Sequence, residues 1–101
     1  MGARLMPLSA MRMSEQRIQI CNKLGLHARA SARLATEASR FKSDISLIKG
    51  DIEVNCKSIM GIMMLAACKG TELLLRAEGS DADEALAAIK ALVDNRFGEA
   101  E

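Results

Sequence analysis

The chain has 101 residues, which suits one domain with a single hydrophobic core. Half of its residues are hydrophobic but only 2% are aromatic, so aliphatic side chains must build most of that core. A net charge of +1 and the shortage of rings for base stacking argue against a nucleic-acid partner. No apolar run approaches the roughly 18 residues of a membrane span, so we expect no membrane insertion.

The N-terminal segment lacks the apolar core of a signal peptide. It does not match the myristoylation pattern either, because the sixth residue is Met6 instead of serine or threonine. We expect a disordered leader over residues 1–14, which Met6, Met11 or Met13 could shorten as initiators, and one domain over residues 15–101.

The three cysteines, Cys21, Cys56 and Cys68, are odd in number and widely spaced. This pattern predicts free thiols and a reducing compartment, the cytoplasm. A zinc site built from them and His27 would lack the close ligand pairs of structural zinc sites, so we expect no metal.

The first half of the chain predicts a strand, a helix and a hairpin. Residues 17–22 alternate, with Ile18 and Ile20 on one face of a half-buried strand. After a turn, the apolar residues Leu34, Ala35, Ala38 and Phe41 recur at helical spacing. The opposite face of this predicted helix is largely basic. Residues 44–55 give two short strands around Gly50, which suits a tight turn.

The second half predicts two helices around a fourth strand. Residues 58–70 begin with the good cap residue Ser58 and end at a glycine, as a short helix does. Residues 71–79 read as a strand, and residues 82–98 as a helix capped by Ser80 or Asp81. The order β-α-β-β-α-β-α predicts an α+β fold with a four-stranded sheet and three helices on one face.

His27 is the sole histidine and stands just before the first helix. Backbone N–H groups there have no intrahelical partner, and the helix dipole is positive, so the position favours anions. Arg29 adds a planar donor fork that suits phosphate. The same positive field favours a neutral, nucleophilic imidazole, which predicts covalent phosphoryl transfer to His27. On position alone, an exposed or capping histidine is the alternative.

Two segments carry a resemblance to a known family: "KLGLHAR" at residues 23–29 and "VNCKSIMGIMML" at residues 54–65. They resemble the phosphohistidine site and the regulatory-serine helix of the HPr family, the histidine-containing phosphocarriers of the phosphoenolpyruvate-dependent phosphotransferase system in its sugar or nitrogen-related branch. The similarity spans residues 16–97 and implies an open-faced β-sandwich of four strands and three helices.

The resemblance implies that His27 accepts phosphate from phosphorylated enzyme I and passes it to a downstream EIIA-type acceptor. Arg29 matches the arginine of the family's site, and the amides of Ala28 and Arg29 would stand near the phosphoryl group. Such a carrier is a stoichiometric relay rather than a turnover enzyme, and it needs no cofactor. Ala30 departs from the proline that relatives often carry there, which could alter transfer rate or partner preference.

Ser58 reads first as an ordinary N-cap, which contributes about 1 kcal/mol. The resemblance implies that a dedicated kinase, HPr kinase/phosphorylase, phosphorylates this serine in some relatives. A phosphate there would be favoured by the helix dipole and would add negative charge beside a partner-facing surface, which would block association.

Apolar side chains cover the whole circumference of the helix after Ser58, although a small two-layer domain buries only one side. We expect one set to face the sheet, namely Ile59, Ile62, Met63 and Ala66. Met60 and Met64 then lie outward. The candidate partner surface of a monomeric carrier comprises Arg33, Ile59, Met60, Met63 and Met64, and it fits a partner with an apolar centre and an acidic rim. The alternatives are an apolar core that extends over more of the helix and a homodimer seam.

Two other classes of function compete with the carrier. One is a thiol enzyme with Cys56 as nucleophile and His27 as base, although no orienting third group is evident. The other is a non-catalytic regulatory binding module of the same fold. A carrier gains an acid-labile phosphate at His27, a binding module gains none, and alkylation of Cys56 inactivates a thiol enzyme.

Overall fold

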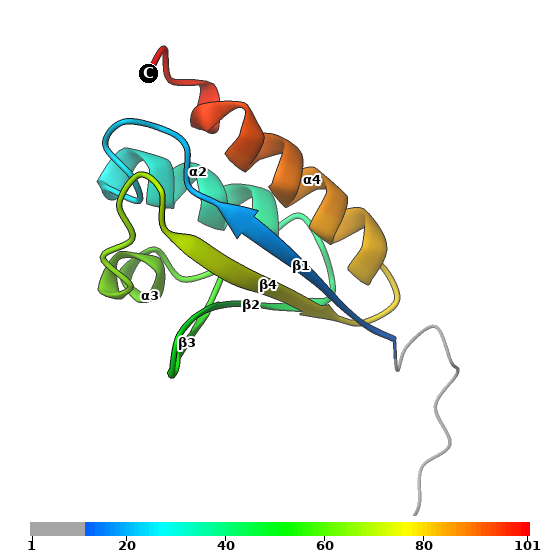
Figure 1. Ribbon diagram of the computed structural model, residues 1–101. Coiled ribbons are helices and arrows are strands. Elements are labelled where there is room, and N and C mark those ends of the chain that lie inside the picture. The colour runs from blue at the N-terminus through cyan, green and yellow to red at the C-terminus, as the bar shows by residue number, and fades with distance from the viewer. Residues whose placement is uncertain (1–11) are drawn as a thin grey trace, which may run out of the picture.

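The computed structural model of the protein describes residues 12–101. It consists of a four-stranded antiparallel sheet with helices on one face (Figure 1). The strands are β1 (Met13–Gln19), β2 (Asp44–Lys49), β3 (Ile52–Asn55) and β4 (Glu72–Glu78), in the order β1-β4-β2-β3. The helices are α2 (Ala28–Ala38), α3 (Ile59–Met64) and α4 (Ala82–Asp94), and a 3-10 turn, η1, follows at Arg96–Gly98. The predicted α+β class and element order are confirmed.

The core lies between the sheet and the helices because the central strands alternate. Leu73, Leu75 and Ala77 of β4 are buried toward the helices, beside Ile45 and Leu47 of β2. Helices α2 and α4 cover this face and contribute buried stripes that include Ala30, Leu34, Ala38, Leu86, Ile89 and Val93. These positions follow the helical period that the sequence predicts, except that Phe41, expected on the same helix, lies beyond the end of α2 and is half-buried.

The opposite face of the sheet is open and polar. Arg76 of β4 donates from Nε to Glu15 Oε2 of β1 at 2.8 Å, and its Nη1 lies 3.8 Å from Glu53 Oε1 of β3. Charged side chains that link β4 to its neighbour β1 and, across β2, to β3 keep this face polar, and the helices lie on the other side of the sheet.

Strand β1 begins at Met13, so the last two residues of the predicted leader, Met13 and Ser14, belong to the sheet. Met13 and Ser14 pair with Glu78 and Ala77 of β4, and Ser14 Oγ donates to Asp83 Oδ1 at 2.6 Å. These contacts recruit the two residues into the sheet although their polarity does not alternate in the sequence. The rest of the predicted leader, residues 1–11, lies outside the described residues.

Asp81 is the N-cap residue of α4, as the sequence allows, but its side chain does not cap the helix. The carboxylate instead accepts hydrogen bonds from the backbone of Lys42 (2.8 Å), the backbone of Ser43 (2.9 Å) and Ser43 Oγ (2.5 Å). These bonds, the Ser43 hydroxyl foremost, lower the pKa of Asp81. Asp81 therefore ties the start of α4 to the loop after α2.

None of the helices between residues 12 and 101 is long and apolar enough to cross a bilayer. The same residues bring no three His, Cys, Asp or Glu side chains together in a way that could hold a metal ion.

Candidate functional site

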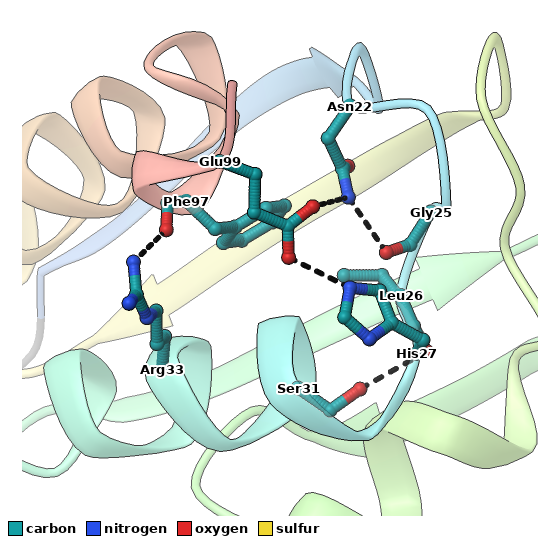
Figure 2. A network of polar contacts seen from close by, with 8 residues as sticks. All are labelled: Asn22, Gly25, Leu26, His27, Ser31, Arg33, Phe97 and Glu99. Atoms are coloured by element: carbon teal, nitrogen blue, oxygen red, sulfur yellow. Dashed lines mark hydrogen bonds and ion pairs between the residues drawn. The ribbon is translucent and has the colours of Figure 1, made fainter. Parts of the chain in front are cut away.

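The site lies where the loop after β1 enters α2, beside the C-terminal segment (Figure 2). His27 is the N-cap residue of α2, and its carbonyl accepts from Ser31 N at 2.8 Å, but its ring makes no capping bond. The side chain is 29% exposed. The ring therefore does not cap α2, although its position in the sequence would allow it, and it is available for other contacts.

The loop before His27 is held firmly. Gly25 has φ +68, and a β-carbon there would collide with the carbonyl of Ala67, so the turn requires glycine. Leu26 is buried, and its backbone N–H donates to Ala67 O at 2.8 Å. The buried Asn22 donates from Nδ2 to Gly25 O at 2.9 Å and closes the turn. The start of α2 is consequently fixed before any ligand arrives.

Glu99 holds one nitrogen of the His27 ring. Its Oε2 lies 2.7 Å from His27 Nε2, and Asn22 Nδ2 donates to its Oε1 at 3.0 Å (Figure 2). The pKa of Glu99 is lowered, first by the hydrogen bond from Asn22 and then by the hydrogen bond and charge of His27 and the charge of Arg29. Partial burial of the carboxylate acts in the opposite direction. An ionised carboxylate only accepts hydrogen bonds, so Nε2 carries the hydrogen, and the lone pair of a neutral ring is on Nδ1.

The C-terminal segment reaches the ring because helix α4 ends earlier than predicted. It stops at Asp94 instead of continuing to residue 98, and Arg96 and Phe97 then take φ values of 55° and 54°. Phe97 is fully buried, and Arg33 of α2 donates to its carbonyl. Sequence reasoning missed Glu99, although a phenylalanine followed by glycine after an amphipathic helix is a signal that the helix ends and the segment beyond it is anchored.

Arg29 shares a shallow pocket of about 370 Å³ with the ring. The pocket is lined by Lys23, Leu24, His27, Arg29, Glu99, Ala100 and Glu101. Arg29 is exposed, and the backbone N–H groups of Ala28 and Arg29 belong to the first turn of α2, where no intrahelical acceptor exists. The structure therefore brings the predicted histidine and arginine together at one opening, at the first turn of α2.

Ser58 is the N-cap of α3, and its Oγ accepts a hydrogen bond from Gly61 N at 3.0 Å. The capping role that the sequence predicts is confirmed. The residue is half-buried and begins the short helix that carries the exposed methionines.

The predicted orientation of α3 is partly wrong. Ile62 is buried as expected, but Ile59 and Met63 are 43% and 41% exposed, and Ala66 is exposed with φ 48. The helix ends at Met64, and its C-cap residue Leu65, three positions after Ile62, is buried where Ala66 was expected. With Met60 and Met64 at 75% and 73%, the exposed apolar surface is wider than the sequence suggests.

Arg33, expected on the partner surface, is engaged with the C-terminal segment through Phe97.

Cys56 is fully buried, and burial raises the pKa of its thiol to about 12, only partly opposed by the charge of Lys57. A buried thiol that stays protonated is no nucleophile, which argues against the thiol enzyme.

Fold and site together define a small α+β domain that presents a single histidine at the start of a helix, with one ring nitrogen that forms no hydrogen bond to residues 12–101. Residues 14–95 match the PTS-HPr family model, described as the PTS HPr component phosphorylation site. The chain belongs to the HPr family of phosphotransferase-system phosphocarrier proteins.

Individual relatives agree with this assignment. The chain is 53% identical to the phosphocarrier protein HPr of Neisseria meningitidis over 89 residues, covering 88% of this chain and all of that protein. It is 46% identical to the phosphocarrier protein NPr of Shewanella violacea, over 85% of this chain and 94% of that protein. The crystal structure of HPr-C-His from Thermoanaerobacter tengcongensis superposes with a TM-score of 0.84 at 45% identity, covering 87% and 99% of the two chains.

Proposed function

We propose that this phosphocarrier takes a phosphoryl group from phosphorylated enzyme I onto His27 and passes it to a downstream EIIA-type acceptor. The observation that carries the proposal is the ring of His27, whose Nε2 faces Glu99 at 2.7 Å and whose Nδ1 is therefore the nucleophilic nitrogen. A non-catalytic binding module has no use for a ring held in this way.

The transfer needs few groups. The Nδ1 lone pair attacks phosphorus, the bond between phosphorus and the donor breaks, and its electron pair stays with the donor. The unpaired N–H groups of Ala28 and Arg29 and the guanidinium of Arg29 suit the oxygens of the arriving group. The carrier is a relay consumed and restored once in each cycle, with no cofactor of its own.

Exposed Ile59, Met60, Met63 and Met64 on α3 support a docking role for this helix. We assign to it partners with an apolar centre and an acidic rim, which would meet Arg29 at the border. The carrier acts as a monomer in the cytoplasm, in line with the free thiols of the described chain.

Ser58 is a candidate regulatory site because it begins the helix that carries this surface. A phosphate on its Oγ adds about two negative charges beside the apolar residues and would repel an acidic rim. The regulation is tested with an HPr kinase, comparing the wild type with Ser58→Ala. Phosphate incorporation that persists in the variant would contradict the assignment.

The carrier role is tested by incubation with phosphoenolpyruvate, magnesium and enzyme I, followed by intact-mass measurement. We expect one phosphoryl group, lost in acid, on the wild type and on Cys56→Ser, and none on His27→Ala. Parallel reactions with sugar-branch and nitrogen-branch enzyme I would show which donor is preferred. No uptake from either donor, each proven active on another carrier, would favour the binding module.

A further inference from the structure

The carboxylate of Glu99 is built into the site rather than resting on it. Its side chain is only 14% exposed, and its two oxygens are engaged by different residues, Oε1 by Asn22 and Oε2 by His27. Asn22 is fully buried, and its Nδ2 lies between two acceptors, Gly25 O and Glu99 Oε1, which fixes the orientation of the amide. Glu99 is thus held in place independently of the ring.

The backbone around Glu99 is held as well. Phe97 fills a fully buried position, Arg33 binds its carbonyl, and Lys23 N donates to Glu101 O at 3.0 Å beyond it. Contacts on both sides of Glu99 fix the position of its carboxylate beside Nε2, as a positioning residue requires.

We propose that Glu99 is a positioning residue that keeps a proton on Nε2 of His27 throughout the phosphoryl cycle and so raises the transfer rate of the phosphoryl group from Nδ1. The inference rests on the proposed function and adds a residue to it.

The chemistry depends on the leaving group. When the phosphoryl group departs, to an acceptor or to water, the bond between phosphorus and Nδ1 breaks and its electron pair returns to Nδ1. With a proton on Nε2, the ring leaves as neutral imidazole. Without that proton it must leave as an imidazolate anion, a much poorer leaving group. A carboxylate at 2.7 Å stabilises the protonated, phosphorylated ring by a charge-assisted hydrogen bond.

Other charges face the same pocket. Lys23 from the loop and Arg29 from α2 disfavour a protonated ring, whereas Glu101 from the C-terminal segment favours it. Among residues 12–101, Glu99 alone hydrogen-bonds to the ring, and it is far more buried than Glu101, whose side chain is 74% exposed. The effect of Glu99 should therefore exceed that of the other charges and be screened least by salt.

The test compares the wild type with Glu99→Gln, which keeps the shape of the side chain and removes its charge. Glu84→Gln is the matched control, because Glu84 is exposed in the first turn of α4, at the far end of that helix from the site. Since the chain has one histidine, a single ring Hε1 signal reports its titration by proton NMR. The second readout is the rate at which isolated phosphorylated protein loses phosphate to water near neutral pH.

In Glu99→Gln, we expect the ring to titrate at lower pH, by an amount that corresponds to about a fivefold loss of proton affinity. The phosphorylated form should lose phosphate about fivefold more slowly near neutral pH. Glu84→Gln should match the wild type in both measurements. Wild-type behaviour of Glu99→Gln in both would overturn the proposal.

Folding of each variant is checked by its amide NMR spectrum. Should Glu99→Gln fail to fold, Glu99→Asp takes its place, because it keeps the charge but withdraws the carboxylate by one methylene. Its titration and phosphate loss should then change in the same direction, and unchanged values would overturn the proposal. The titration of the ring is measured without a donor enzyme. A wild type that never accepts phosphate would therefore contradict the proposed function without affecting the titration test of Glu99.

Discussion

Arg33, midway along α2, donates a hydrogen bond to the carbonyl oxygen of Phe97, two residues before Glu99. Helix α2 therefore supports both halves of the site, the ring at its N-terminus and the C-terminal segment along its side (Figure 2). Gly98 has φ 78 and lies so close that a β-carbon would overlap Arg33 Nη1. Glycine at this position allows the segment to turn across the helix.

Removal of this tie should loosen the C-terminal segment. For Arg33→Ala, we expect faster amide hydrogen exchange at Gly98 and Glu99 and a loss of about 1 kcal/mol of unfolding free energy. Arg40→Ala is the control, since Arg40 is an exposed residue in the turn after α2, where its side chain pairs with Glu37 and lies 5.7 Å from the centre of the Phe41 ring, away from the C-terminal segment. Equal exchange rates in the two variants would contradict a tie through Arg33.

Phe97 should anchor the segment more strongly than Arg33, because it is fully buried in the core. Phe97→Ala leaves a cavity, and we expect it to cost about 3–5 kcal/mol of unfolding free energy, measured by denaturant titration. Phe97→Leu should lose much less. An alanine variant as stable as the leucine variant would show that the ring does not fill the core.

Asp81 should make stability sensitive to acid. Its pKa is lowered in the folded protein, foremost by the Ser43 hydroxyl, so its contribution is present above the unfolded value and is lost as pH falls through the folded value. We expect Asp81→Asn to be less stable at neutral pH and to approach the wild type below about pH 4. Thermal unfolding across this range measures the effect, with the exposed Asp51→Asn as control. A gap between wild type and variant that stays constant with pH would refute it.

Ser58→Ala removes the acceptor for the N–H of Gly61 at the start of α3. We expect a loss of about 1 kcal/mol of unfolding free energy. Ser58→Asp, which can accept the same bond, should recover most of it. The comparison by denaturant titration separates the capping role from any regulatory one, and equal stability of all three proteins would argue against the cap.

The three thiols should differ in reactivity. Cys68 is exposed, Cys21 is partly exposed, and Cys56 is buried with its pKa raised to about 12 by burial. Treatment of the native protein with iodoacetamide at mildly alkaline pH should label Cys68 first and Cys56 only after unfolding. Peptide mass mapping reads the order, and rapid labelling of Cys56 in the native state would contradict its burial.

The sequence predicts most of the fold because its signals are local and periodic. Alternation in Leu73, Leu75 and Ala77 and helical spacing in α2 each follow from one element, and both are confirmed. The predicted cap at Ser58 and the turn at Gly50, with φ 59, are confirmed for the same reason. Each depends on a few neighbours along the chain, which a pattern can represent.

Where predictions were wrong, distant residues had decided the outcome. The facing of Ile59 and Met63 depends on how α3 packs against α2 and β3, and the role of Asp81 depends on Ser43, which lies in the loop after α2. Neither dependence leaves a periodic trace in the sequence.

By itself, the sequence determined the order of the elements, the core stripes and the position of His27 before a helix. Only the tertiary structure decided the state of its ring, because Glu99 lies 72 residues away and meets Nε2 through a tail held by Phe97, Arg33 and Asn22. A hydrogen bond acts over about 3 Å, and spacing along the chain does not encode which distant groups come that close.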